Sequence, residues 1–120
     1  MKKLLTLLLL VLSISGVFAQ APQKMSYQTV IRDSENALVA NKVVSIIIVI
    51  IQGSPTGTII YAEKHTPTTN INGLASLEIG GGTVIAGTMA SIDWSTGPYF
   101  IQTETDPNGG SSYSILVQVN

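Results

Sequence analysis

Cysteine is absent from the 120 residues of this chain. Its absence excludes disulfide bonds, thiolate metal sites, a cysteine nucleophile and lipid attachment through an N-terminal cysteine. A domain without crosslinks must draw its stability from its apolar core, and a chain of roughly 100 residues is long enough to bury such a core.

Charge is also scarce, because only 11% of the residues are Asp, Glu, Lys or Arg and the formal net charge is −1. The sequence has no basic cluster and no interleaving of basic with aromatic residues, so it offers no electrostatic basis for binding nucleic acid. It has no basic amphipathic helix for a membrane surface either. We therefore expect no nucleic-acid partner and no membrane association of the mature chain.

Histidine occurs once, at His65. Catalysis by a Ser-His-Asp triad would need a serine nucleophile and an orienting carboxylate beside it, and no glycine-flanked nucleophile motif is present. Glycoside hydrolysis needs two facing carboxylates. No motif selects a pair among the candidates, which are Glu63, Glu78, Asp93 and Glu104. We expect no catalytic residues and no cofactor.

Glu63 has a simpler interpretation as a structural carboxylate. It lies between Tyr61 and His65 on one face of a predicted strand. If that face points inward, the carboxylate needs hydrogen-bond donors. Candidate donors are Tyr27, Trp94 and backbone amides.

Two loop motifs have the composition of ligand sites but the spacing of ordinary turns. Residues 106–109, Asp-Pro-Asn-Gly, are rich in oxygen but do not follow the EF-hand pattern. Residues 80–82 are three glycines without the Lys-Ser/Thr and the helix of a phosphate loop. We expect neither a metal site nor a phosphate site.

The N-terminus carries the pattern of an export signal. Lys2 and Lys3 precede a largely apolar stretch at residues 4–14, and Val17-Phe18-Ala19 provides small or modest residues before a cleavage site. The pattern predicts a cleavable signal peptide at residues 1–19 and a domain at residues 20–120. The alternative is an uncleaved anchor, but a membrane span needs roughly 20 apolar residues. We expect an exported protein that is extracellular, periplasmic or on the cell surface.

The rest of the chain is organised around residues 43–51, Val-Val-Ser-Ile-Ile-Ile-Val-Ile-Ile. Eight of these nine residues are apolar and β-branched, and such side chains pack well on a pleated sheet. We predict a central β-strand. Its second face is almost wholly apolar, so either both faces are covered or one is left for a protein partner. In the latter case, the expected partner surface is Ile47, Val49 and Ile51.

The remaining segments alternate between strand and turn patterns. Asn36 tolerates a positive φ and is expected in the first turn. Residues 83–96 have weak periodicity and are interpreted as a loop that packs Val84, Met89, Ile92 and Trp94 against one end of the domain. The spacing predicts an all-β, antiparallel β-sandwich of about seven strands. The further extended segments are residues 25–32, 37–40, 58–66, 74–79, 99–105 and 112–119.

Aromatic residues make up only 6% of the chain, yet three of them are close in sequence: Trp94, Tyr99 and Phe100. They could form a stacking platform for a sugar, although aromatic residues in small β-domains more often belong to the core or its rim. We keep them as a candidate ligand patch.

Several sequence strings together resemble a known family. They are Tyr27-Gln28 with Val30 and Arg32-Asp33; residues 52–57 with Tyr61 and Glu63; Asn72-Gly73-Leu74 with Leu77, Ile79 and Gly80; and Ile92-Asp93-Trp94 with Gly97-Pro98-Tyr99 and Glu104-Thr105-Asp106. In order and spacing they resemble the N-terminal β-module of exported Bacteroidetes-type cell-surface proteins, which often precedes collagen-like or tail-fibre-like regions. The resemblance covers nearly all of the mature chain. It implies an Ig-like or prealbumin-like sandwich with an extracellular structural role, and it brings no catalytic residues.

These observations favour a secreted or cell-surface structural and interaction module without catalytic activity. The expected partner is a protein, either a second copy or another cell-surface component. The alternative is a module that binds a carbohydrate or another surface ligand through the aromatic patch.

Overall fold

The computed structural model of the protein describes residues 24–119, so the predicted signal peptide at residues 1–19 lies outside the described residues. Seven strands form within them, with two short 3-10 helices and no α-helix. None of the described helices is long and apolar enough to cross a membrane. The strands are β1 (Met25–Val30), β2 (Ser45–Gln52), β3 (Thr58–His65), β4 (Leu74–Ile79), β5 (Thr83–Ala86), β6 (Tyr99–Asp106) and β7 (Ile115–Val119), and the helices are η1 (Met89–Ser91) and η2 (Trp94–Thr96).

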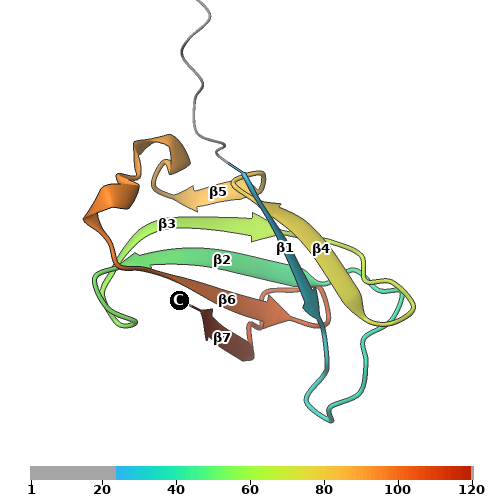
Figure 1. Ribbon diagram of the computed structural model, residues 1–120. Coiled ribbons are helices and arrows are strands. Elements are labelled where there is room, and N and C mark those ends of the chain that lie inside the picture. Colours follow the sequence, from blue (N-terminus) through green and yellow to red (C-terminus); the bar gives the residue numbers. More distant parts are fainter. Residues whose placement is uncertain (1–23, 120) are drawn as a thin grey trace, which may run out of the picture.

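The strands form two antiparallel sheets of unequal width. The smaller sheet pairs β1 with β4, and the larger sheet has the order β5-β3-β2-β6-β7. In Figure 1 the smaller sheet lies obliquely across one half of the larger sheet. Buried side chains of both sheets meet in one apolar core, for example Ile46 and Ile48 of β2 with Ala75 and Ile79 of β4. The all-β, two-sheet prediction is therefore confirmed.

β2 is the central strand of the larger sheet, as its β-branched sequence predicts. It pairs with β6 over its whole length on one side and with β3 from Ile46 to Gln52 on the other. Ile46, Ile48 and Ile50 point into the core and are fully buried. The strand begins at Ser45, two residues later than predicted, because Val43 forms only an isolated bridge with Thr68.

Residues 83–96 correct one prediction. Thr83–Ala86 form β5, which pairs with β3 at the edge of the larger sheet. The sequence Thr-Val-Ile-Ala does not alternate between apolar and polar residues, so its pattern did not mark a strand, and all four residues are exposed. Of the side chains expected to pack, Met89 contacts the core and Ile92 is partly buried, whereas Val84 and Trp94 are exposed.

The turn after β1 follows its sequence prediction. Asn36 has φ of 63°, in the left-handed region that asparagine tolerates. Oδ1 of Asp33 accepts hydrogen bonds from the N–H groups of Glu35 at 2.9 Å and Ala37 at 3.0 Å. This side chain therefore holds the turn closed. The predicted extended piece at residues 37–40 is reduced to one bridge, between Leu38 and Arg32.

Candidate functional site

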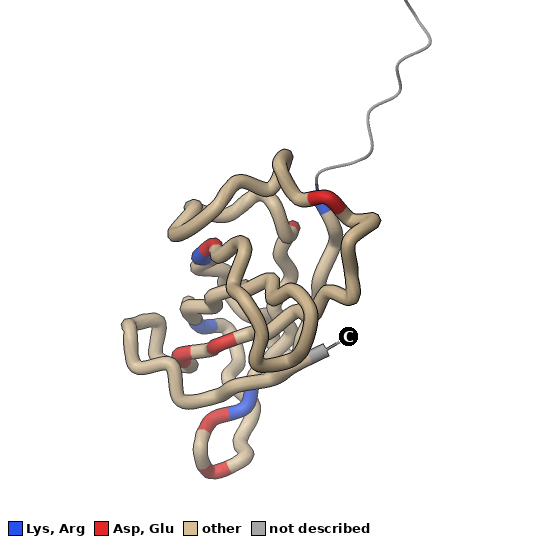
Figure 2. The backbone as a smooth tube through the Cα atoms, turned by 90° about the vertical axis from the view of Figure 1, so that its left-hand side faces the viewer, with Lys and Arg blue, Asp and Glu red and all other residues tan. Residues whose placement is uncertain are grey.

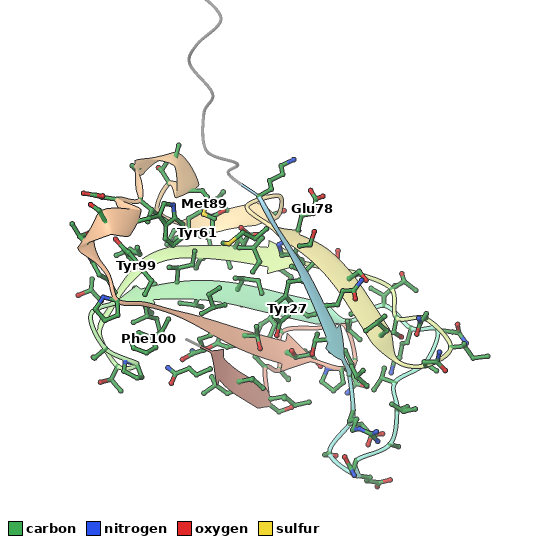
Figure 3. The ribbon with its side chains drawn as sticks, viewed as in Figure 1. Tyr27, Tyr61, Glu78, Met89, Tyr99 and Phe100 are labelled. Atoms are coloured by element: carbon green, nitrogen blue, oxygen red, sulfur yellow. The ribbon has the colours of Figure 1, made fainter. Side chains whose placement is uncertain are left out.

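The predicted aromatic patch is only partly assembled. Trp94 of η2 and Tyr99 of β6 pack edge to face, with ring centroids 5.1 Å apart and an interplanar angle of 66°. Trp94 keeps 49% of its surface exposed. Phe100 is the next residue of the same strand, so its ring leaves the opposite face of the sheet (Figure 3). The structure thus brings Trp94 and Tyr99 together and separates Phe100 from them.

Hydrogen bonds hold the loop that carries the Trp94–Tyr99 pair. Asp93 caps η2, because its Oδ1 accepts from the Ser95 hydroxyl at 2.5 Å and from the Ser95 N–H at 3.1 Å. The same two bonds hold the pKa of Asp93 below its ordinary value. The Tyr99 hydroxyl donates to the Asp93 carbonyl. These polar groups are engaged within the loop, so the indole of Trp94 is the part that is open to a ligand.

The predicted partner surface on β2 is largely covered. Val49 and Ile51 are 5% and 4% exposed, and they form a second apolar cluster against which Ile47 and Phe100 pack. The cover comes from the neighbouring strands, because β3 and β6 flank β2 on both sides and present side chains on the same face. Of the two alternatives that the sequence left open, the structure shows the covered face at Val49 and Ile51, and it leaves Ile47 partly open.

Glu63 is a fully buried carboxylate on the inner face of β3. Its Oε1 accepts a hydrogen bond from the N–H of Gly80 at 2.6 Å, and its Oε2 accepts one from the N–H of Gly82 at 3.0 Å. Nε2 of His65 is hydrogen-bonded to the same Oε2. Backbone amides, one of the donor sources predicted from the sequence, thus satisfy this carboxylate, and the three-glycine turn supplies them.

Tyr61 and Gly82 complete the surroundings of Glu63. Burial, a hydrogen bond to Glu63 and the negative charge of Glu63 raise the pKa of Tyr61 from 10.0 to about 12. A Cβ at position 82 would lie 2.6 Å from Nε2 of His65 and 2.7 Å from Oε2 of Glu63, so the close approach requires glycine. The cluster therefore joins β3 to the turn between β4 and β5.

Asp106 organises the turn between β6 and β7. It is 3% exposed. Its Oδ1 accepts from the N–H of Asn108 at 2.9 Å, and its Oδ2 accepts from the N–H of Ser112 at 3.0 Å. These bonds, with the Gly110 N–H and the positive charge of Lys42, hold the pKa of Asp106 below its ordinary value. The turn is thus built of N–H donors around an anionic side chain.

Charged side chains form no concentrated surface in the described part of the chain. Figure 2 shows the Lys and Arg positions dispersed over the fold. Within residues 24–119, no group of three or more His, Cys, Asp or Glu residues is placed to hold a metal ion. Neither a basic patch nor an acidic cluster therefore defines a site.

The sandwich is open on the side where β1 faces β7. A groove of about 140 Å³ lies there, lined by residues 29–32, by Thr103 and Thr105 of β6, and by Ile115 and Val117 of β7. Val30 and Val117 remain 51% and 46% exposed. The sequence patterns did not predict this groove. The available signal was the absence of charge and proline from β1 and β7, because edge strands usually carry such residues.

Comparison with known proteins gives one match. The model of a family described as Domain of unknown function (DUF8740) matches residues 26–117, which is most of the chain. No curated protein and no solved structure matches.

Proposed function

We propose that this chain, which belongs to the DUF8740 family of domains of unknown function, is an exported structural and interaction module without catalytic activity. In this proposal it acts outside the cytoplasm, at the cell surface or in the periplasm, and its partner is a protein. The family membership is the premise, and the reasons for the proposed role come from the strands at the sheet edges.

The uncharged edge strands carry the proposal. β1 reads Met-Ser-Tyr-Gln-Thr-Val and β7 reads Ile-Leu-Val-Gln-Val, so neither contains a charged residue or a proline. Soluble β-proteins usually protect their edges with such residues, because unpaired backbone groups are templates for another strand. Strand addition at a sheet edge is a common mode of protein recognition. Two unprotected edges beside an apolar groove therefore favour a binding role.

The polar clusters support a role without catalysis. Glu63 receives hydrogen bonds from two backbone amides and His65, and Asp106 receives them from the turn that follows it. A catalytic acid or base must be within reach of a substrate, whereas these carboxylates are committed to holding turns.

The export signal and the finer fold type also belong to the proposal. Residues 1–19 have the composition of a cleavable signal peptide. The two packed antiparallel sheets are compatible with an Ig-like or prealbumin-like sandwich. This agrees with the resemblance to the N-terminal modules of exported Bacteroidetes-type cell-surface proteins.

The test uses the full chain with a C-terminal tag in its native host. We expect the protein in the exported fraction, with an N-terminus at Gln20. We also expect slower amide hydrogen exchange along an edge strand when the purified protein is mixed with the cell-envelope fraction of that host, but not with heat-denatured envelope. A cytoplasmic protein that retains residues 1–19, or unchanged exchange at every amide, would refute the proposal.

A second candidate function is carbohydrate or surface-ligand binding, which the exposed Trp94–Tyr99 pair favours. Exposed aromatic rings provide flat apolar faces on which a sugar ring can stack. Trp94 is the only tryptophan, so its fluorescence reports on this position alone. We expect a panel of glycans to include one that changes this fluorescence, with Tyr99→Ala weakening the response and Phe100→Leu leaving it unchanged. A fluorescence that no glycan changes would exclude this function.

A further inference from the structure

The open side of the sandwich results from the unequal width of its sheets. Two strands, β1 and β4, face a sheet of five. In Figure 1, β1 crosses over the larger sheet near the end of β6, and no strand of the smaller sheet follows it on the side of β7. Val117 of β7, which pairs with the buried Thr103, consequently stays 46% exposed beside the groove. The place where a third strand of the smaller sheet would lie is empty of described chain.

The backbone of β1 offers a row of hydrogen-bonding groups toward this place. The N–H of Ile31 bonds the carbonyl of Gly73 at 2.8 Å, on the side of β4. In an antiparallel ladder, alternate residues point their backbone groups to opposite sides. The N–H and C=O groups of Gln28, Val30 and Arg32 therefore project from the free edge of β1, and Val30 and Arg32 line the groove. An extended polypeptide carries a matching row of N–H and C=O groups, so it is the ligand that such an edge suits best.

The floor of the groove suits alternating apolar side chains. Thr103 and Thr105 of β6 are buried, and Ile115 and Val117 of β7 present branched apolar side chains beside them. A strand added to the edge of β1 would point every second side chain toward this floor. Those side chains should be small or β-branched, because the volume of about 140 Å³ leaves little room.

Arg32 gives the groove its only charged lining group. One of its guanidinium nitrogens, Nη1, donates to the carbonyl of Asn36 at 3.0 Å. The one ion pair among the described residues joins His65 and Glu63, so no described carboxylate pairs with Arg32. An acidic residue in the bound segment would complement this charge.

A second copy of the chain meets these requirements poorly. Its edge strands β1, β5 and β7 contain no carboxylate that could pair with Arg32. Its remaining strand at an edge, β4, contains Glu78, but its inward side chains Ala75 and Ile79 are buried in their own core. They are not available to lie on the groove floor of another copy.

We propose that the groove between β1 and β7 binds an extended segment of another protein, which adds to β1 as a third strand of the smaller sheet. Its small or β-branched apolar residues lie on Ile115 and Val117, and an acidic residue lies beside Arg32. This inference rests on the proposed interaction function and specifies its site and the chemistry of its partner.

The test uses a synthetic peptide of alternating valine and threonine that ends in glutamate, with both termini blocked. Amide hydrogen exchange of the isotope-labelled full chain is followed by NMR with and without the peptide. We expect slower exchange at the amides of Gln28, Val30 and Arg32. Arg32→Gln should weaken binding by roughly 1.5- to fivefold, the usual range for an exposed ion pair. Val117→Lys should abolish binding, because it places a charge on the apolar floor.

The controls separate the groove from the other edge. Val84→Lys makes the same change at an exposed position of β5, which is the edge strand opposite β7 in the larger sheet. This variant should leave binding intact. A peptide methylated at alternate backbone nitrogens should not bind, because it cannot pair with β1. This control needs no change in the protein, so it tests strand pairing with β1 even if Val117→Lys fails to fold.

The outcomes also distinguish this inference from the proposed function. Exchange that slows at β5 or β7, and not at β1, would show that the groove is not the binding site. This result, with the peptide or with the envelope fraction, would still support an interaction module. A dimer that dissociates on Val117→Lys, observed by light scattering, would overturn the choice of partner. No change of exchange with either the peptide or the envelope fraction would overturn both.

Discussion

Glu63 joins β3 to the turn between β4 and β5. Its carboxylate lies fully buried on β3, and the N–H groups of Gly80 and Gly82 and Nε2 of His65 converge on it. Burying an ionised group is costly unless it is paired and hydrogen-bonded. Here the two backbone donors belong to a turn, so their hydrogen bonds to the carboxylate also fix the position of that turn.

We predict that Glu63→Gln lowers the free energy of unfolding by about 2 to 3 kcal/mol, the usual effect of leaving buried donors unsatisfied. The amide has nearly the same shape, but its NH₂ group must face at least one N–H donor. Urea unfolding followed by circular dichroism measures the change. Glu78→Gln is the matched control, because Glu78 is exposed on β4 (Figure 3), and its effect should stay within about 0.5 kcal/mol. Equal effects of the two substitutions would refute the structural role.

At the scale of the element, β2 is unusual in burying both of its faces. Ile46, Ile48 and Ile50 belong to the inner side, whereas Val49 and Ile51 are buried on the outer side by neighbours within the same sheet. The inner cover is a second layer, the smaller sheet. On the outer side, Ala62 of β3 and Phe100 of β6 pack with Val49 and Ile51, and the Tyr113 hydroxyl is hydrogen-bonded to Ser45. The two faces therefore differ in how much packing a substitution removes.

We predict that Ile48→Ala lowers the free energy of unfolding by about 3 to 4 kcal/mol, as for large-to-small changes in a closed core. Ile47→Ala, on the adjacent and partly open position, should cost about 1 kcal/mol, close to the average for point substitutions. Denaturant unfolding of the two variants under identical conditions gives the comparison. A cost at Ile47 that matches the cost at Ile48 would mean that the outer face is covered by a further layer, as in a tight dimer.

At the scale of the whole molecule, few charges determine how stability depends on pH. Hydrogen bonds from Ser95 hold the pKa of Asp93 below 3.8, and the Asn108 N–H leads those that lower the pKa of Asp106. Burial and Glu63 raise the pKa of Tyr61 from 10.0 to about 12. A carboxyl group whose pKa is lower in the folded than in the unfolded state stabilises the fold at pH values above the unfolded pKa. This stabilisation is lost as the pH falls through the folded pKa. A tyrosine whose pKa is higher in the folded than in the unfolded state stabilises the fold at pH values below the unfolded pKa. This stabilisation is lost as the pH rises through the folded pKa.

We therefore predict a melting temperature that declines below about pH 4 and again between about pH 10 and 12, with a plateau between these limits. Thermal unfolding by circular dichroism at a series of pH values tests this. Asp106→Asn should flatten the acid limb, and Tyr61→Phe should flatten the alkaline limb. If the alkaline limb is unchanged in Tyr61→Phe, the loss of stability at high pH comes from groups other than Tyr61.

The local features of this protein follow from its sequence alone. The β-branched run of β2 favours an extended strand, the alternation in β4 predicts its inward side chains as Ala75, Leu77 and Ile79, and Asn36 supplies the positive φ of the first turn. These properties depend on the preferences of one residue and its neighbours along the chain. They could be predicted because no distant partner changes them.

Only the tertiary structure decided which surfaces are open. Val49 and Ile51 are buried because of the strands that flank β2, and the segment at β5 became a strand because β3 was there to pair with it. The groove beside β1 arises from the difference in width between two sheets, to which residues far apart in the sequence contribute. Exposure depends on the neighbours that pairing brings together in space, whereas strand formation depends largely on the neighbours along the chain.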